Sequence, residues 1–321
     1  MHGYLSKKTL AELKQHNMTI VMQNMRMTAE LTRVMQALEE NAIEVLAFKG
    51  PILAQIAYGD ITLRQFGDLD LLCKKEDLYR INTLLKTLQY DSVFKLTAIQ
   101  QKAWLKHTHD VAYIHASTDI ILEMHWSLLD NDYPLTFNLD SIWNHPDTVT
   151  IKGQRIKTFA SESLLFYLCV HGSKHLWERI EWIKDIDLII RTQAIDWDKL
   201  AKQVNNSGFE RMFLLGLSLS SDLFQTPLPT NLQQQINNQS WLKKLSRFVI
   251  NDWQQHSNMP QQTVAMLSLF PTLSLKLQYL HKIILKPSRT EYSFIDLPEK
   301  WYWCYYLVRP YLLIKKYLFK R

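Results

Sequence analysis

The sequence predicts an α+β protein in which a small mixed sheet of four to five strands with flanking helices precedes an all-helical lobe. Short apolar runs that are typical of strands alternate with amphipathic stretches before residue 145, whereas the apolar runs after Ser161 keep helical spacing. The 321 residues are 47% hydrophobic and 21% charged, which is the composition of a folded globular chain. We expect a boundary within 145–160, giving domains at 1–155 and 156–321.

The elements of the first half follow from the spacing of their apolar residues. Residues 7–40 place apolar side chains three and four positions apart, which predicts a long helix. The short apolar run at 43–48 predicts a strand, and Gly50 and Pro51 then mark the start of a helix over 51–58. The remaining predicted elements are a strand at 68–73, helices at 74–88 and 99–106, and strands at 110–117 and 118–128 joined by a short turn.

Helices account for the whole of the second half. Ser161 precedes an apolar run with helical spacing and is typical of a helix start. Polar or proline-containing breaks separate the segments that follow. The first four predicted helices cover residues 161–176, 178–192, 195–204 and 209–224, and further helices continue to Arg321.

Charge and cysteine content narrow the function classes. The chain has 37 Lys and Arg against 31 Asp and Glu, and this formal charge of +6 favours an anionic partner such as a nucleotide, RNA or a lipid headgroup. A solvated, slightly basic surface accounts for the same excess of positive charge.

Cys73, Cys169 and Cys304 lie far apart in the sequence, so neither a disulfide framework nor a zinc knuckle is supported. Without an apolar leader or an uncharged apolar stretch of membrane-spanning length, we expect a cytoplasmic protein.

Two acidic residues on one predicted strand are the strongest functional signal. Alternation along residues 68–73 places Asp68 and Asp70 on one face of the strand and Leu69 and Leu71 on the other. Two carboxylates so close together repel each other, and both stay ionised only beside a cation or in open water. A divalent metal ion satisfies the first condition. The Asp-x-Asp pattern alone is weak evidence, so the interpretation depends on other residues.

Lys49, Gly50 and Glu123 supply that support. Lys49 and Gly50 stand at a predicted helix start, where free backbone N–H groups and the helix dipole suit phosphate oxygens. Glu123 lies in the middle of an apolar strand, where an unpaired carboxylate is a costly core residue. A phosphate cradle, paired acids and a third acid on a later strand are the parts of a metal-dependent nucleotidyl transfer site.

These residues resemble the signature of the DNA polymerase β-like nucleotidyltransferase superfamily. More closely, the stretches FKG and GDLDLL, Tyr58, Arg64, the EMHW strand and the later HGSKHLWERIEWIKDIDLII resemble the bacterial uncharacterised nucleotidyltransferase family, often found near polysaccharide and modified-peptide biosynthesis genes. The resemblance covers roughly residues 40–195. One departure is Gly50-Pro51, because the superfamily usually has Gly-Ser or Gly-Gly there and Lys49 has to replace the serine contact.

The resemblance implies a reaction. An acceptor hydroxyl or phosphate attacks the α-phosphate of an NTP, with ATP favoured, so that an NMP is transferred and pyrophosphate is released. Asp68, Asp70 and Glu123 are then the catalytic residues and the ligands of Mg²⁺, with Mn²⁺ as an alternative ion. Glu123 is also a candidate base for the acceptor hydroxyl.

The resemblance also implies nucleotide contacts from both halves of the chain. The helical half is expected to close over the nucleotide and bind the acceptor. The candidate nucleotide-binding residues are Lys49, Gly50, Tyr58, Arg64, His171, Lys174, His175 and Asp185.

Several of these candidates have a second interpretation. His171 and His175 are equally compatible with ordinary surface or interface positions, and a zinc pair is disfavoured because no third ligand follows. Asp185 is expected to face the cleft as a base or as a partner of Lys174 or Arg64. His125 either supports the metal ligands or lies at the cleft edge.

Two alternative functions and the identity of the acceptor remain open. A toxin-like enzyme that adds nucleotides to tRNA needs a broad basic surface, which the weak net charge does not favour. A nucleotide-binding protein without catalysis is disfavoured because all three carboxylates are present. The acceptor itself carries no motif, and a polysaccharide precursor, a modified peptide or tRNA each fit.

The C-terminus mixes aromatic and basic residues. Residues 301–321 contain tryptophans, tyrosines and five basic side chains, a mixture that suits an interfacial helix on an anionic membrane near a lipid-linked sugar. Such a helix would make the protein peripheral to the inner membrane face. A terminal helix packed on the helical lobe, with a solvated basic end, accounts for the same residues.

Overall fold

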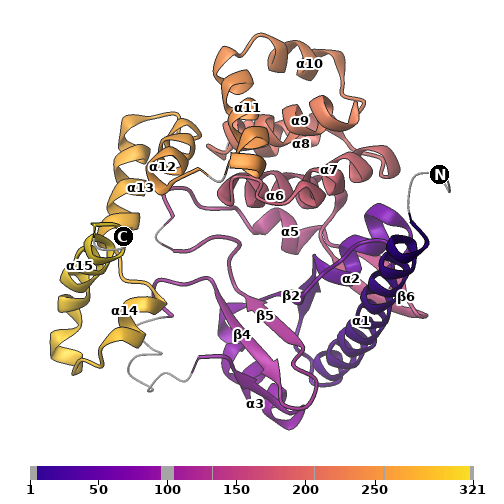
Figure 1. Cartoon of the computed structure of the whole chain (residues 1–321). Coiled ribbons are helices and arrows are strands. Elements are labelled where there is room, and N and C mark those ends of the chain that lie inside the picture. Colours follow the sequence, from indigo (N-terminus) through magenta and orange to yellow (C-terminus); the bar gives the residue numbers. More distant parts are fainter. Residues whose placement is uncertain (1–5, 95–104, 132, 206, 256, 319–321) are drawn as a thin grey trace.

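The sheet and the helical region predicted from the sequence are both present. The computed structural model of the chain describes residues 6–94, 105–131, 133–205, 207–255 and 257–318. Five strands form a mixed sheet in the order β1-β2-β5-β4-β3, with β2 and β5 parallel and the other neighbours antiparallel (Figure 1). These strands are β1 (Val45–Ala47), β2 (Asp68–Cys73), β3 (Tyr90–Ser92), β4 (Asp110–His115) and β5 (Ile121–His125). The α+β fold class is confirmed.

Helices flank the sheet and make up most of the rest. Those of the first half are α1 (Lys7–Glu40), α2 (Gly50–Leu53), the π-helical turn η1 (Ala54–Tyr58), the 3₁₀ turn η2 (Lys75–Asp77), α3 (Leu78–Thr87) and α5 (Asp140–Asn144). Those of the second half are α6 (Ser161–Lys174), α7 (Ile180–Thr192), α8 (Trp197–Asn205), α9 (Glu210–Phe224), α10 (Thr230–Asn237), α11 (Ser240–Gln255), α12 (Met259–Ser268), α13 (Leu273–Leu285), α14 (Arg289–Phe294), η3 (Glu299–Cys304) and α15 (Tyr305–Leu318).

Helix α1 packs, together with α3, against one face of the sheet. The Ser6 side chain caps its N-terminus by accepting a backbone hydrogen bond. Met27, Leu31, Val34 and Leu38 are spaced three or four positions apart and are at most 1% exposed. This apolar stripe buries the sheet face that carries no acidic residues, so the other face is left for the site.

The two faces of β2 enter different cores. Leu69, Leu71 and Cys73 pack in the core that includes α1 and α3. Leu72, which points to the opposite side, packs with Phe48 in the core of the helical lobe. The aspartates of β2 alternate with the first set, so they share the face of Leu72 and are directed toward the helices that follow residue 160.

Trp177 lies at the centre of the helical lobe. Its side chain is fully buried, and its backbone carbonyl accepts a 2.6 Å hydrogen bond from Trp253 Nε1 in α11. Gly172 in α6 and Gly216 in α9 pass so close to the indole ring that neither position has room for a side chain. Helices α6 and α9 can therefore approach each other closely around this ring.

Gly172→Ala is expected to lower the free energy of unfolding by about 1 to 3 kcal/mol, the usual cost of overpacking a filled core. A Cβ atom at this position would lie 2.4 Å from Trp177 Cζ3. Urea unfolding followed by circular dichroism measures the loss. Gly67→Ala is the matched control, because a Cβ there meets no atom within 4 Å. Equal stability of the two variants would contradict the prediction.

The structure also contains strands that the sequence did not reveal. Strand β3 has only three residues, two of them polar, and so carries no apolar alternation. Strands β6 (Asp147–Ile151) and β7 (Gln154–Thr158) form a separate antiparallel hairpin around a turn at Lys152 and Gly153, both with positive φ. This hairpin occupies the stretch predicted as the domain boundary. The division into 1–155 and 156–321 stays a prediction.

Other predicted elements are close to those observed. The helix expected at 51–58 is present as α2 followed by the π-helical turn η1. The strand expected at 43–48 is shorter, at Val45–Ala47. The helix expected at 99–106 lies outside the described residues, except for its last two positions.

The C-terminal helices α12 to α15 form a group beside the rest of the helical lobe (Figure 1). Helix α13 packs against α15, and α14 packs against α15 as well. Among the described residues, no helix has the length and hydropathy needed to cross a lipid bilayer.

Candidate active site

Gly50 lets the chain after β1 approach β2 closely, and this close approach positions the first residues of the site. Its φ is +53°, a left-handed conformation that glycine adopts without strain. A Cβ atom at this position would lie 3.0 Å from the backbone oxygen of Asp68. This contact between the first turn of α2 and the start of β2 brings the neighbouring Lys49 over the sheet face that carries Asp68 and Asp70, which we call the acidic face.

Strand pairing gathers four ionisable side chains on that face. Strands β2 and β5 run parallel with Asp70 opposite Glu123, and His125 lies two residues further along β5. Residues two positions apart share a face, so Asp68, Asp70, Glu123 and His125 all point to the same side. Strand β4 adds Asp110 opposite His125, and this carboxylate accepts a 3.0 Å hydrogen bond from a threonine hydroxyl.

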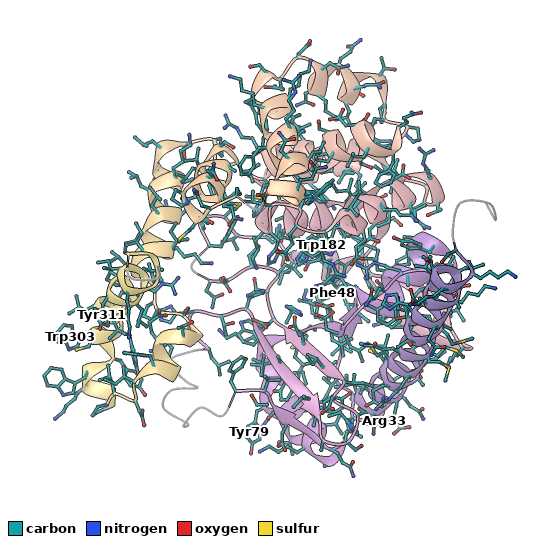
Figure 2. The ribbon with its side chains drawn as sticks, viewed as in Figure 1. Arg33, Phe48, Tyr79, Trp182, Trp303 and Tyr311 are labelled. Atoms are coloured by element: carbon teal, nitrogen blue, oxygen red, sulfur yellow. The ribbon has the colours of Figure 1, made fainter. Side chains whose placement is uncertain are left out.

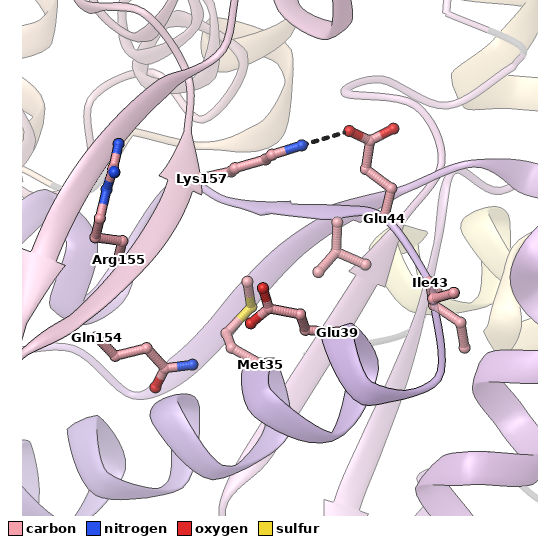
Figure 3. A pocket seen from close by; sticks show the side chains of 9 residues that line it. Met35, Glu39, Ile43, Glu44, Gln154, Arg155 and Lys157 are labelled. Carbon is pink, nitrogen blue, oxygen red and sulfur yellow. Dashed lines mark hydrogen bonds and ion pairs between the residues drawn. The ribbon is translucent and has the colours of Figure 1, made fainter.

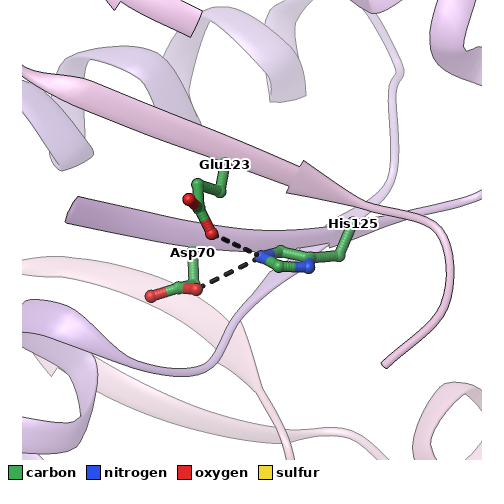
Figure 4. Close-up of side chains that lie close together, drawn as sticks. All are labelled: Asp70, Glu123 and His125. Atoms are coloured by element: carbon green, nitrogen blue, oxygen red, sulfur yellow. Dashed lines mark hydrogen bonds and ion pairs between the residues drawn. The ribbon is translucent and has the colours of Figure 1, made fainter. Parts of the chain in front are cut away.

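The distances within this group are short. Lys49 Nζ lies 2.7 Å from Asp70 Oδ1. His125 Nε2 lies 3.2 Å from the same oxygen and 3.4 Å from Glu123 Oε2 (Figure 4). One potential ligand atom from each of Asp70, Glu123 and His125 lies within 4.8 Å of the others. The other Asp70 oxygen, Oδ2, is buried and accepts no hydrogen bond from any described residue. The site therefore contains an unused anionic oxygen.

The pKa values of the two aspartates move in opposite directions. The charge of Asp70, followed by burial, raises the pKa of Asp68 to about 6. Burial would raise the pKa of Asp70 too, but the charge of Lys49 and the hydrogen bond from His125 outweigh it and lower that pKa to about 2. Asp70 is thus ionised because of its cationic neighbours, whereas Asp68 takes up a proton slightly below neutral pH.

This donor set fits a divalent metal ion. Carboxylate oxygens are the ligands that Mg²⁺ and Mn²⁺ prefer, and three carboxylates share the face. A cation beside Asp70 would use its free Oδ2 and would remove the repulsion that raises the pKa of Asp68. The fit therefore rests on an unsatisfied buried oxygen and on like charges placed together.

Binding of Mn²⁺ is expected to weaken by about tenfold for each pH unit below about 6, because a metal ligand must be deprotonated and Asp68 has a pKa of about 6. The sign follows from the raised pKa: Asp68 is ionised above it and protonated below it. Titrations with Mn²⁺ followed by electron paramagnetic resonance at pH 5, 6 and 7 test this. Equal affinity at pH 5 and pH 7 would exclude Asp68 as a ligand.

Comparison with protein families decides what kind of protein carries this site. A family described as "Uncharacterised nucleotidyltransferase" matches residues 1–225, which is more than half of the chain. The chain belongs to this family. The resemblance predicted from the sequence and the classification as a transferase enzyme are therefore confirmed. The match includes the whole five-stranded sheet and helices α6 to α9 of the nucleotidyltransferase, and it ends before α10.

Solved structures with distant similarity include two of ANT(2'')-Ia, an antibiotic-resistance factor. Its solution structure is 10% identical, with a TM-score of 0.41 over 56% of this chain and 90% of that one. Its complex with adenylyl-2''-tobramycin is 11% identical, with a TM-score of 0.40 over 56% and 94%. An antigenic nucleotidyltransferase-like protein from Paracoccidioides brasiliensis is 15% identical, with a TM-score of 0.43 over 65% and 91%. No curated protein matches the chain.

Tyr58, Arg64 and Asp185 form one buried network in the nucleotidyltransferase. Arg64 Nε lies 2.9 Å from Asp185 Oδ1, Arg64 Nη2 lies 3.0 Å from Oδ2, and the Tyr58 hydroxyl donates to Oδ1 at 2.9 Å. Asp185 is fully buried in α7, so the network joins that helix to the segment before β2. Of the two partners expected for Asp185, the structure shows Arg64. The nucleotide-binding role of the three residues stays a prediction.

His171, Lys174 and His175 lie at the C-terminal end of α6, on the side of Lys49. The rings of His171 and His175 are 4.9 Å apart, and both contact Trp182. Burial lowers the pKa of all three residues, and the charge of Lys49 lowers each further. Both imidazoles are therefore neutral at pH 7. Their nucleotide-binding role also stays a prediction.

The structure places a second ionic cluster beside the carboxylates. His109 Nδ1 lies 2.7 Å from Asp130 Oδ1, and Lys282 Nζ in α13 contacts the other oxygen of Asp130. The ring of His109 is 5.6 Å from that of His125. Burial lowers the pKa of His109 and outweighs the hydrogen bond to Asp130, so its ring is neutral at pH 7. No spacing in the sequence pointed to this cluster.

Two cavities lie on different sides of the sheet and the helical lobe. One of about 330 Å³ is lined by residues of α1, of β7 and of the segment that leads into β1, and in it Glu44 pairs with Lys157 at 2.8 Å (Figure 3). It contains none of the carboxylates of the acidic face. A second of about 300 Å³ is lined by Lys174, His175 and residues of α12 and α13. This second cavity opens next to the residues at the end of α6.

Proposed function

We propose that this nucleotidyltransferase moves an NMP, with AMP favoured, from an NTP to a hydroxyl or phosphate group of an acceptor and releases pyrophosphate. The observation that carries the proposal is the acidic face of β2 and β5. There Asp70, paired with Glu123 across the sheet, keeps a buried oxygen without a hydrogen bond among the described residues. Family membership supports the reaction class.

Asp68, Asp70 and Glu123 would hold Mg²⁺, or alternatively Mn²⁺, through their carboxylate oxygens. When bound, such an ion supplies charge stabilisation to the phosphoryl oxygens and orients the reacting groups. His125 positions two of these ligands, because its Nε2 lies within 3.4 Å of both Asp70 and Glu123. Burial alone would lower the pKa of His125. Its hydrogen bonds to Asp70 and Glu123 outweigh burial and raise this pKa to about 9, so the imidazole is positively charged at pH 7.

Lys49 has two roles in this proposal. Without nucleotide, its ammonium pairs with Asp70 and partly neutralises the acidic face. The N–H groups of Ile52 and Leu53 bond to the carbonyl of Lys49, so the backbone phosphate cradle expected at this helix start is not available, and the phosphate contact falls to the Lys49 ammonium. We assign Lys49 to the triphosphate once a divalent cation neutralises Asp70.

The helical half would close over the nucleotide and bind the acceptor. His171, Lys174 and His175 would contact the nucleotide from this half, and the cavity of about 300 Å³ that Lys174 and His175 line would hold part of an acceptor. Glu123 is the favoured base for the acceptor hydroxyl, since Asp185 is bonded through both oxygens. A polysaccharide precursor, a modified peptide and tRNA are the acceptor classes to compare.

A cytoplasmic location accompanies this proposal. The free thiols of Cys73, Cys169 and Cys304 suit a reducing compartment, and the cytoplasm supplies both NTP and Mg²⁺.

The test is an incubation of the protein with each of the four labelled NTPs, with Mg²⁺ or with EDTA, and with each acceptor class. We expect metal-dependent NTP binding and pyrophosphate release, with ATP preferred, and transfer of label to one acceptor class. Transfer to tRNA alone would favour the toxin-like alternative. NTP binding without pyrophosphate release would favour a binding protein, and no binding of any NTP would contradict the proposal.

A further inference from the structure

Helix α15 and the turn before it expose a continuous row of apolar side chains. We call this row the C-terminal apolar face and define it as Trp301, Trp303, Leu307, Tyr311 and Ile314. Each of these residues is between 47% and 62% exposed. The last three are four and three positions apart on α15, so they lie on one side of the helix. Figure 2 shows Trp303 and Tyr311 at the outer edge of the molecule.

Buried contacts on the other side of α15 fix the orientation of this face. Tyr305 is fully buried and its hydroxyl donates to the backbone oxygen of Ile295 at 2.9 Å. Arg309, one turn later, lies 2.8 Å from Ser288 Oγ and 3.2 Å from Glu291 Oε1. The helix is therefore held by one side, and the exposure of the opposite side is a property of the fold.

The surroundings of the face are basic. Residues 296–321 include six Lys and Arg residues against two acidic ones, Asp296 and Glu299, and one of the six, Arg309, pairs with Glu291 on the other side of α15. Lys300 and Lys315 are both exposed, and Lys315 is next in the chain to Ile314 of the C-terminal apolar face. Three further basic residues follow in the sequence, at positions 316, 320 and 321. A surface that offers tryptophan, tyrosine and aliphatic side chains beside positive charge is complementary to a bilayer with anionic headgroups.

We propose that the C-terminal apolar face docks the protein on the surface of a membrane that contains anionic lipids. Trp301, Trp303 and Tyr311 would lie at the headgroup level, where aromatic side chains concentrate, while Leu307 and Ile314 reach the acyl chains. The aliphatic pair favours lipid over a nucleic acid, whose surface offers charged phosphates and stacked bases but no apolar phase for them. The helix lies along the membrane surface and does not cross it.

This inference is independent of the transfer reaction. The family match ends at residue 225, so the C-terminal apolar face belongs to a part of the chain that the family does not describe. Lipid binding can be measured without NTP or acceptor. Failure of the reaction assay would therefore leave the membrane proposal intact, and the reverse also holds.

The experiment is co-sedimentation of the full chain with vesicles of phosphatidylcholine alone and with vesicles that also contain phosphatidylglycerol. We expect binding to the anionic vesicles to be at least about tenfold stronger than to the neutral ones, and to weaken as salt is added. Tryptophan emission should shift to shorter wavelength with the anionic vesicles only. Absence of binding to the anionic vesicles would overturn the proposal.

A variant test locates the binding surface. Trp303→Ser combined with Leu307→Ser and Tyr311→Ser should weaken vesicle binding by about tenfold or more, while the circular dichroism spectrum stays that of the parent. Met22→Ser combined with Leu63→Ser is the matched control, because both residues are more than 60% exposed and lie elsewhere. Unchanged binding by the triple variant would overturn the proposal.

Light scattering in solution separates docking on lipid from self-association. We expect the parent protein to show no concentration-dependent dimer through this face. A dimer that the triple variant abolishes, without vesicle binding by the parent, would assign the face to a second copy of the chain and overturn the membrane proposal. Binding to RNA in place of vesicles would overturn it as well.

Discussion

Asp70→Asn is expected to lower the rate of metal-dependent pyrophosphate release by about 10³-fold or more. The asparagine side chain keeps the shape of Asp70 but loses the negative charge, and its amide nitrogen cannot bind a metal at the position of the free Oδ2. Charge stabilisation by a catalytic metal supplies several kcal/mol, and each 1.36 kcal/mol corresponds to about tenfold in rate. Steady-state kinetics with the preferred NTP and Mg²⁺ measure the effect.

The control for this variant is Asp198→Asn, which removes one carboxylate from an exposed position of α8. It should leave the rate unchanged. Binding of Mn²⁺ by the Asp70 variant gives a second measurement that does not depend on the acceptor, and we expect it to be lost together with turnover. If Asp70→Asn keeps more than about a tenth of the parent rate, the acidic face of β2 and β5 is not the catalytic metal site.

Arg64→Ala is expected to lower the free energy of unfolding by about 3 to 5 kcal/mol. Arg64 is 7% exposed and Asp185 is fully buried, so among the described residues the substitution leaves this buried carboxylate with only the Tyr58 hydroxyl as its hydrogen-bond partner. Breaking a buried ion pair by removing one member has this cost, because the remaining charge is no longer compensated. Urea unfolding followed by tryptophan fluorescence measures the change.

Arg80→Ala is the matched control, since Arg80 forms its ion pair with Asp77 at the surface, where its side chain is 51% exposed. Exposed pairs of this kind contribute less than about 1 kcal/mol. Asp185→Asn should destabilise the protein as Arg64→Ala does, because it removes the other charge of the same pair. A loss no larger for Arg64→Ala than for Arg80→Ala would show that the network is dispensable for folding.

Local rules were sufficient for the acidic residues of the site. Period-two alternation puts Asp68 and Asp70 on one face of β2 whatever the strand pairs with. A carboxylate in the middle of an apolar strand needs a reason, and this singled out Glu123. The sequence could not supply the register, in which β5 runs parallel to β2 and sets Glu123 opposite Asp70. That register depends on contacts between distant segments.

The contacts of Asp130 with His109 and Lys282 could not be predicted from the sequence, for the same physical reason. Asp130 meets His109 across 21 positions of the chain and Lys282 across 152, and no local periodicity encodes such contacts. Helical spacing grouped His171 with His175 correctly, because neighbours on a helix are set by the helix itself. The pairing of Arg64 with Asp185 was one of two partners considered, and the tertiary fold selects between them.

Contacts between residues before and after position 225 determine how short a folded fragment of this protein can be. A fragment that ends there keeps every residue matched by the family, yet it exposes the backbone carbonyl of Trp177 that Trp253 covers and removes Lys282 from Asp130. Arg211 would also lose the carbonyl of Ser268, to which it donates at 2.7 Å. A fragment designed as the catalytic core should therefore include the helices through α13. Only the segment after α13, which carries the C-terminal apolar face, can be left out.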